Sequence, residues 1–183
     1  LLDRARDRRE LRLWSAGCAT GEEAYSLAML VSDALGADVA RWSVRIFATD
    51  ADPEAIAFAR RGIYPSSSLK GLDEAMLARH FRHLDGAYEV APHIRAMTVF
   101  GEHDLAQRAP FPRIDLVLCR NVLIYFTSEL QRRALQLFAF SLRDGGYLIL
   151  GKSETGHPQP TAFVVEDAGL RIFRRSGDRV LIP

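Results

Sequence analysis

A short apolar run, followed by a loop of small residues and an amphipathic segment, constrains this chain more than any other feature. Residues 11–14 (LRLW) lead into the loop SAGCATG at 15–21. The next segment has apolar residues at helical spacing, which predicts a helix that ends near Leu35. In open α/β sheets, a strand, a glycine turn and a helix N-terminus together build a nucleotide or cofactor pocket. We therefore predict a cofactor site at this turn.

The residues after the turn indicate which ligand it takes. A phosphate-binding loop needs Lys and then Ser or Thr after its second glycine, whereas Gly21 precedes Glu22 and Glu23. Two carboxylates at a helix start repel a pyrophosphate but suit an ammonium or sulfonium ligand such as S-adenosylmethionine. Glu23 also has the spacing of a capping box with Thr20. The sequence leaves both interpretations of Glu23, cap and ligand contact, open.

Composition narrows the class of protein. The chain has 183 residues, 48% of them hydrophobic, and a net charge of +1, as in an ordinary globular domain and unlike a nucleic-acid-binding one. No run is long enough to insert into a membrane. Cys18 and Cys119 are too few for a disulfide framework, so we expect a cytoplasmic protein. We interpret residues 1–10 as the end of an upstream linker or helix and 11–183 as one domain.

A second strand and helix follow the same pattern. Residues 42–49 predict a strand that ends at Asp50, and Asp52 with Pro53 predicts the start of a helix that stops at Gly62. An acidic residue at the end of the second strand of such a sheet binds a ribose diol well, because its two oxygens accept two hydroxyls. Asp50 is therefore a candidate ribose ligand. The alternative is that Asp50 is a turn residue with a structural role alone.

Residues 63–100 interrupt the alternation of strands and helices. They hold a helical patch and an Asp-Gly hairpin signal at 85–86, before residues 97–100 return to the main sheet. We interpret this segment as a small antiparallel insertion. His80 and His83 are three residues apart, but nothing supplies a third ligand, so we predict no metal site.

The remaining elements complete the sheet. Residues 103–105 close the third strand, and the apolar run 114–119 predicts a strand buried on both faces. A helix capped by Thr127 or Ser128 is expected to extend to Leu142 and to stop at 144–146. A strand at 147–150 and a hairpin of 162–165 with 170–173 follow. The chain therefore predicts an α/β fold: a Rossmann-like, doubly wound sheet with an antiparallel hairpin at one edge and one insertion.

Several motifs now carry a resemblance to a known family. They are residues 14–23 (WSAGCATGEE), 48–52 (ATDAD), 61–64 (RGIY), 119–126 (CRNVLIYF) and 151–154 (GKSE). In this order they resemble the CheR-type chemoreceptor glutamate O-methyltransferases, from about Leu11 onward. The resemblance implies an S-adenosylmethionine-dependent methyltransferase domain with an inserted β-subdomain that contacts the receptor. It also implies an N-terminal helical domain, which this sequence lacks.

The resemblance also implies roles for individual residues. On the cofactor, Gly17 and Glu23 face the methionine end, Asp50 holds the ribose, and Asp104 and Leu105 lie beside the adenine. On the remaining wall, Arg120 and Asn121 line the pocket floor, and Tyr125 lies near the transferred methyl group. Two positions depart from the family pattern, since Ala24 is commonly Pro and Asp104 is commonly Asn. The second departure bears on the adenine contacts.

The implied chemistry agrees with the residue types present. A glutamate side chain is ionised near neutral pH, so its attack on a sulfonium methyl needs placement and desolvation rather than a general base. Tyr125 is then expected to orient the carboxylate or the methyl group, with a buried structural ring as the alternative. Arg120 either attracts the anionic substrate or pairs with a local Asp.

The expected activity is methyl transfer to glutamate side chains in the cytoplasmic domain of a chemoreceptor, with S-adenosylhomocysteine as the product. One alternative is a non-catalytic S-adenosylmethionine-binding or partner-docking module of a larger signalling protein. Another is a methyltransferase that acts on a small carboxylic acid or on a different protein. The sequence carries no signal for an oligomeric state.

Overall fold

A seven-stranded sheet forms the centre of the protein in the computed structural model, which describes residues 1–106, 111–154, 158 and 161–177. The spatial order of its strands is β6-β2-β1-β7-β8-β10-β9. The first five run parallel, and β10 and β9 add an antiparallel hairpin at the edge. The strands are β1 (Glu10–Ala16), β2 (Ser43–Asp50), β6 (Thr98–Glu102), β7 (Ile114–Cys119), β8 (Leu142–Leu150), β9 (Phe163–Asp167) and β10 (Ile172–Arg175). The predicted Rossmann-like sheet with a hairpin edge is confirmed.

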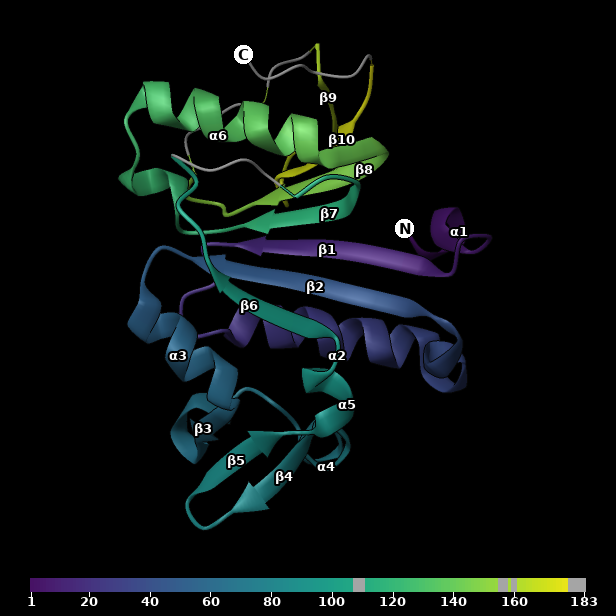
Figure 1. Cartoon of the computed structure of the whole chain (residues 1–183), viewed down its shortest axis with the longest axis vertical. Coiled ribbons are helices and arrows are strands. Elements are labelled where there is room, and N and C mark those ends of the chain that lie inside the picture. Colours follow the sequence, from purple (N-terminus) through teal and green to yellow (C-terminus); the bar gives the residue numbers. More distant parts are fainter. Residues whose placement is uncertain (107–110, 155–157, 159–160, 178–183) are drawn as a thin grey trace.

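Helices cover both faces of this sheet (Figure 1). The longest are α2 (Glu22–Leu35) on one face and α6 (Ser128–Ser141) on the other, with α3 (Pro53–Arg61) following β2. Both ends of α3 and the start of α6 follow the predicted signals. The Asp52 carboxylate accepts the N–H groups at the start of α3, and Gly62 ends that helix at a φ of +63°. Thr127 caps α6 through the N–H of Leu130.

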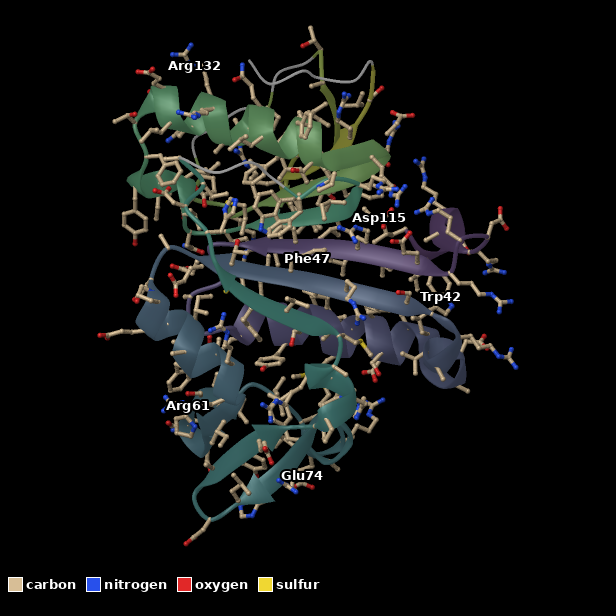
Figure 2. All side chains as sticks on the ribbon, in the orientation of Figure 1. Trp42, Phe47, Arg61, Glu74, Asp115 and Arg132 are labelled. Carbon is tan, nitrogen blue, oxygen red and sulfur yellow. The ribbon has the colours of Figure 1, made fainter. Side chains whose placement is uncertain are left out.

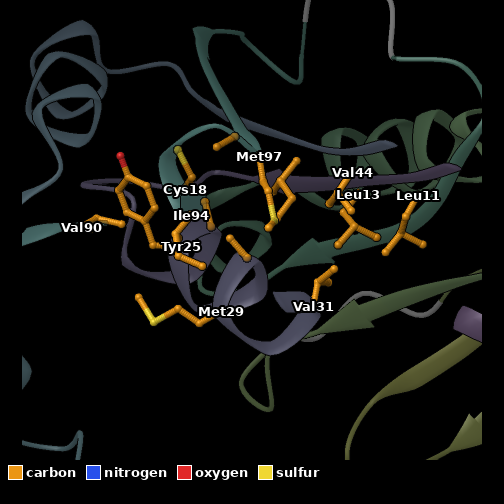
Figure 3. Close-up of a cluster of buried hydrophobic side chains, with 14 of the residues drawn as sticks. Leu11, Leu13, Cys18, Tyr25, Met29, Val31, Val44, Val90, Ile94 and Met97 are labelled. Atoms are coloured by element: carbon orange, nitrogen blue, oxygen red, sulfur yellow. The ribbon is translucent and has the colours of Figure 1, made fainter. Parts of the chain in front are cut away.

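Two hydrophobic cores result, one on each face. Figure 3 shows the first, in which Leu11, Tyr25 and Met97 pack between α2 and the strands β1, β2 and β6. The second lies under α6 and is centred on Trp14, whose ring makes an edge contact with Phe138 at 5.5 Å between centroids. Both faces of β1 are thus buried, which fixes the position of the loop that follows it.

The predicted insertion forms a separate three-stranded sheet of order β3-β5-β4, beside the end of α3 (Figure 1). Its strands are β3 (Ile63–Pro65), β4 (Phe81–Leu84) and β5 (Ala87–Val90), with α4 (Glu74–His80) before β4 and α5 (Pro92–Arg95) after β5. From Thr98 the chain re-enters the main sheet as β6. Phe81 and Val90 pack into the same core as α2, so the insertion is joined to the main domain by apolar contacts.

The predicted end of α6, start of β8 and end of β6 are wrong. Helix α6 ends at Ser141, and residues 144–146 lie inside β8 instead of stopping the helix. Gly145 has a φ of +72° where the pairing of β7 with β8 shifts register, so the glycines form a bulge, and Leu142 begins the strand. Residues 103–105 lie just beyond β6, which ends at Glu102.

A buried carboxylate attaches the start of the chain to the sheet. Asp115, at the amino end of β7, accepts the backbone N–H of Arg12 at 2.9 Å and pairs with Arg8 at 2.7 Å. Figure 2 shows Asp115 near α1 (Leu2–Ala5). Burial raises the pKa of Asp115, and the arginines oppose that rise. This contact lies at the opposite end of β7 from the loops described next.

Candidate cofactor-binding site

Four loops meet where the strand order reverses, at the carboxyl ends of β1, β2, β6 and β7, and enclose a cavity of about 420 Å³. Ligands of open α/β sheets bind at such a switch point. Six of the eight predicted site residues line this cavity: Gly17, Asp50, Asp104, Leu105, Asn121 and Tyr125. The lining also includes residues that the sequence analysis did not select: Ala19, Ala51, His103, Val122 and Phe126.

Gly17 lets the first loop approach the last one closely. Its φ is +71°, and a Cβ added there would lie 2.2 Å from Cγ2 of Val122. Real Cβ atoms do not approach other carbons this closely, so any side chain at position 17 displaces Val122. Gly17 and Val122 both line the cavity, so its floor takes its shape from this contact.

The backbone N–H groups of the glycine loop are already used within the protein. Those of Gly17 and Cys18 donate to the carbonyl of Thr49 at 2.8 and 2.9 Å, and that of Gly21 donates to the carbonyl of Cys18. A phosphate-binding loop keeps such groups free for its ligand. The observed hydrogen bonds therefore argue against a pyrophosphate, in agreement with the carboxylates that follow the loop.

Asp50 joins two of the loops at the end of β2. Its Oδ2 accepts the N–H of Ala19 at 2.8 Å, and its Oδ1 accepts the N–H of Asp52 at 3.0 Å. Each carboxylate oxygen has a second lone pair. Asp50 can therefore hold the glycine loop and still accept two hydroxyl groups from a ligand in the cavity that it lines.

The third wall of the cavity follows β6. The N–H of His103 donates to the carbonyl of Asp50 at 2.9 Å, and the His103 ring meets Trp14 edge to face at 5.6 Å between centroids. The Oδ1 of Asp104 accepts the N–H of Ala106 at 2.8 Å. Sequence reasoning missed His103 as a lining residue. Its position next to Asp104 at a strand end was the available signal.

The loop after β7 forms the last wall. Asn121 adopts a φ of +58°, and the 3₁₀ helix Leu123–Tyr125 follows it. Tyr125 is 81% exposed, and it lines the cavity. The structural alternative, a buried ring with a satisfied hydroxyl, is therefore wrong. A phenol at the mouth of a cavity is accessible to a second, incoming molecule.

Glu23 and Arg120, the two remaining predicted residues, pair with each other instead of lining the cavity. Arg120 Nη1 lies 2.7 Å from Glu23 Oε1. The capping-box interpretation of Glu23, one of the two left open, is wrong, since Gly21 is the N-cap of α2 without a side-chain hydrogen bond, and the hydroxyl of Thr20 donates to Glu22. Burial raises the pKa of Glu23, and Arg120 opposes that rise. The partner of Arg120 is a glutamate 97 residues away, so the alternative of a local Asp is wrong, and attraction of the anionic substrate stays a prediction.

The two thiols near the site are unsuited to nucleophilic chemistry. Burial raises the pKa of Cys18 to about 12, with the Asp50 carboxylate adding to the effect. Burial likewise raises the pKa of Cys119. A thiol is a good nucleophile only as the thiolate. Both cysteines therefore stay protonated at neutral pH and serve as small apolar residues.

Tyr64 connects the inserted sheet to the glycine loop. Its hydroxyl donates to the carbonyl of Thr20 at 2.7 Å. A Cβ on Gly21 would lie 3.1 Å from the same hydroxyl, so the loop and the tyrosine are in close contact. Burial raises the pKa of Tyr64. The sequence motif at 61–64 contained this residue, but only the structure shows what it contacts.

The described ranges contain no cluster of three or more His, Cys, Asp or Glu side chains with the arrangement of a metal site. His80 instead pairs with Asp33, at 3.0 Å from its Nε2. Among the helices of the described residues, none combines the length and the apolar character needed to cross a membrane.

Comparison with known proteins shows which family the sequence is similar to. A family model described as "CheR methyltransferase, SAM binding domain" matches residues 1–170. A protein of Rhodobacter capsulatus, described as an uncharacterized 104.1 kDa protein in the hypE 3′ region, is 46% identical over 90% of this chain. A chemotaxis protein methyltransferase of Listeria monocytogenes is 41% identical over 80% of this chain.

The chain corresponds to only part of these relatives. It spans 17% of the Rhodobacter protein and about half (55%) of the Listeria methyltransferase. Among solved structures, a TehB-like S-adenosylmethionine-dependent methyltransferase from Corynebacterium glutamicum superposes with a TM-score of 0.53 at 13% identity, covering 96% of this chain and 86% of that one. At this identity the likeness supports the fold alone.

Proposed function

The chain belongs to the CheR family of S-adenosylmethionine-binding methyltransferase domains, and on that basis we propose that it methylates glutamate side chains of chemoreceptors. The observation that carries the proposal is the cavity at the switch point, which six of the predicted site residues line. Its volume of about 420 Å³ lies within the range of roughly 300–1,000 Å³ that small-molecule and cofactor sites occupy.

The residues at the cavity fit the parts of the cofactor. The free lone pairs of Asp50 match the two hydroxyls of a ribose. The Glu23–Arg120 pair offers one anion and one cation beside the cavity, which match the ammonium and carboxylate of the methionine end. Asp104 can only accept hydrogen bonds, so among adenine groups it favours the exocyclic amine. We propose these residues, with Gly17, Leu105 and Asn121, as the cofactor site.

Bound S-adenosylmethionine supplies an activated methyl group. A glutamate carboxylate oxygen forms the new bond to that methyl carbon while the carbon–sulfur bond breaks, and the sulfur keeps the electron pair as the neutral thioether of S-adenosylhomocysteine. No proton moves, so the protein needs to supply placement and the exclusion of water rather than a base. The exposed hydroxyl of Tyr125 is proposed to donate a hydrogen bond that orients the incoming carboxylate.

Replacing Tyr125 with phenylalanine tests this role. We expect methyl transfer to a receptor cytoplasmic fragment to fall about tenfold to a hundredfold, because a hydrogen bond to a charged group contributes roughly 1.5–3 kcal/mol. The affinity for S-adenosylhomocysteine should stay within about twofold, since the hydroxyl acts on the second substrate. The measurement is transfer of label from radioactive S-adenosylmethionine, with binding followed by calorimetry.

A matched control is Tyr147→Phe, which removes a hydroxyl from a tyrosine of β8 that does not line the cavity. We expect it to transfer methyl groups at the wild-type rate. Equal rates for wild type and Tyr125→Phe would remove Tyr125 from the proposed role. A wild-type chain that binds the cofactor product but transfers no methyl group would count against the activity itself.

One observation favours a second candidate, a non-catalytic S-adenosylmethionine-binding or docking module of a larger signalling protein. The chain spans only 17% of its Rhodobacter relative. Such a module binds S-adenosylhomocysteine without methylating any receptor fragment. The labelled-transfer experiment therefore separates the two candidates.

A chemoreceptor substrate implies where the protein works and which partner it meets. Chemoreceptor glutamates of the kind proposed lie on the cytoplasmic domain of the receptor, so we propose that the protein works in the cytoplasm. Both cysteines are free and buried, as suits a reducing compartment. We propose the inserted sheet of β3, β4 and β5 as the part that faces the receptor.

A further inference from the structure

A buried acidic residue lies behind the loop that carries Asn121 and Tyr125. Glu154 follows β8, and only 3% of its surface is exposed. Its Oε1 accepts the backbone N–H of Val122 at 3.0 Å. Glu154 does not line the cofactor cavity, so its contribution is made through the loop rather than through a ligand.

The burial of Glu154 is not explained by stability. Its Oε2 is buried and has no hydrogen-bond partner among the described residues. A buried carboxylate with an unsatisfied oxygen is costly, and an apolar side chain of the same size would fill the space at lower cost. Within the described part of the chain, the carboxylate holds one group, the N–H of Val122, and we look for the benefit that offsets this cost there.

The turn that carries Glu154 fits directly against the loop. The N–H of Glu154 donates to the carbonyl of Gly151 at 3.1 Å, which closes the turn. A Cβ on Gly151 would lie 3.3 Å from the backbone nitrogen of Asn121 and 3.4 Å from Cα of Arg120. The two backbones are therefore in contact, and Glu154 reaches the loop without crossing solvent.

The N–H of Val122 lies at the point in the loop where a hydrogen bond affects both neighbouring parts, Asn121 before it and the 3₁₀ helix after it. Asn121, just before it, has a φ of +58°, a left-handed conformation that Asn adopts more readily than most residues with a side chain and that a neighbouring contact helps to hold. Val122 contacts Gly17, and the 3₁₀ helix that ends at Tyr125 starts directly after it. The far end of the loop is held separately by Gln131, whose amide donates to the carbonyls of Leu123 and Phe126.

We propose that Glu154 is a positioning residue, which fixes the loop of residues 120–126 by its hydrogen bond to Val122 and so sets one wall of the cofactor cavity. The importance of that wall for cofactor binding rests on the proposed function. The hydrogen bond itself exists without a ligand, so the positioning role can be tested separately.

Hydrogen exchange of the Val122 amide tests the positioning role. Glu154→Met keeps the size of the side chain but removes the acceptor, and we expect at least tenfold faster exchange of this amide. Glu154→Gln keeps an acceptor oxygen, so exchange should stay within about threefold of wild type. The matched control is Asp115→Leu, which removes a buried carboxylate at the opposite end of β7 and should leave Val122 exchange relative to the core amides unchanged.

A uniform increase of exchange across all core amides in Glu154→Met, with no excess at Val122, would show a merely structural role and overturn the proposal.

Titration with S-adenosylhomocysteine adds the second readout. We expect at least tenfold weaker binding for Glu154→Met and near wild-type binding for Glu154→Gln. Equal binding by all variants overturns the proposal, whereas a wild-type chain that does not bind contradicts the proposed function and leaves the exchange result to decide on Glu154.

Discussion

Substitution of Gly17 by alanine is expected to weaken the binding of S-adenosylhomocysteine by a factor of about 100 or more. The added Cβ would lie 2.2 Å from Cγ2 of Val122, and one of the two loops must move. Overpacking of this kind costs roughly 1–3 kcal/mol, which weakens binding where the ligand needs both loops in place. The φ of +71° costs roughly 1–2 kcal/mol more for a residue with a side chain, and this strain lowers the stability. Calorimetric titration measures the affinity, and thermal unfolding measures the stability.

Gly86→Ala is the matched control. Gly86 has a φ of +72°, but nothing lies within 4 Å of its Cβ position. It therefore carries the same backbone strain without the collision, and we expect lower stability with unchanged affinity. If Gly17→Ala and Gly86→Ala had the same effect on binding, the contact between Gly17 and Val122 would not shape the site.

The second large effect is expected for Asp50→Ala. The substitution removes the carboxylate proposed to bind the ribose hydroxyls and also frees the N–H groups of Ala19 and Asp52. Hydrogen bonds to a charged group contribute roughly 1.5–3 kcal/mol, so we expect about 10- to 150-fold weaker binding of S-adenosylhomocysteine. Calorimetry on the purified variant gives this ratio directly.

Asp52→Ala is the control for loop and helix damage. Asp52 caps α3 through the N–H groups of Glu54 and Ala55 and does not line the cavity. Loss of the cap costs roughly 1 kcal/mol of stability and should leave the affinity within about twofold of wild type. Similar binding losses in the two variants would mean that Asp50 acts only by holding the loop.

The local parts of the fold were predictable because their signals lie within a few residues. The cap and proline at Asp52 and Pro53 placed the start of α3 correctly, and the apolar run at 114–119 gave the buried strand β7. The end of α6 was not predictable from the residues alone. A glycine with positive φ, such as Gly145, serves equally well to end a helix and to form a bulge, and strand pairing decides between them.

In the candidate site, too, some features were predictable from the sequence and others depended on contacts between distant segments. The switch-point rule and the motifs brought together Gly17, Asp50 and Asn121, because strand ends of a parallel sheet meet at one edge. Side-chain pairs between distant segments were beyond the sequence. Glu23 and Arg120 are 97 residues apart, and Val122 and Glu154 are 32 apart, so nothing local predicts either contact. In each case the motifs included the residue, but only the folded structure shows which residue it contacts.

A crystal structure of the chain grown with S-adenosylhomocysteine is the most direct test of the central claim, that the crevice between β1, β2, β6 and β7 is a methyl-donor site. We expect one ligand molecule there, with both ribose hydroxyls within hydrogen-bond distance of Asp50 and the thioether sulfur on the side of Tyr125. A ligand bound elsewhere on the chain, or a crevice without one at saturating concentration, would contradict the account.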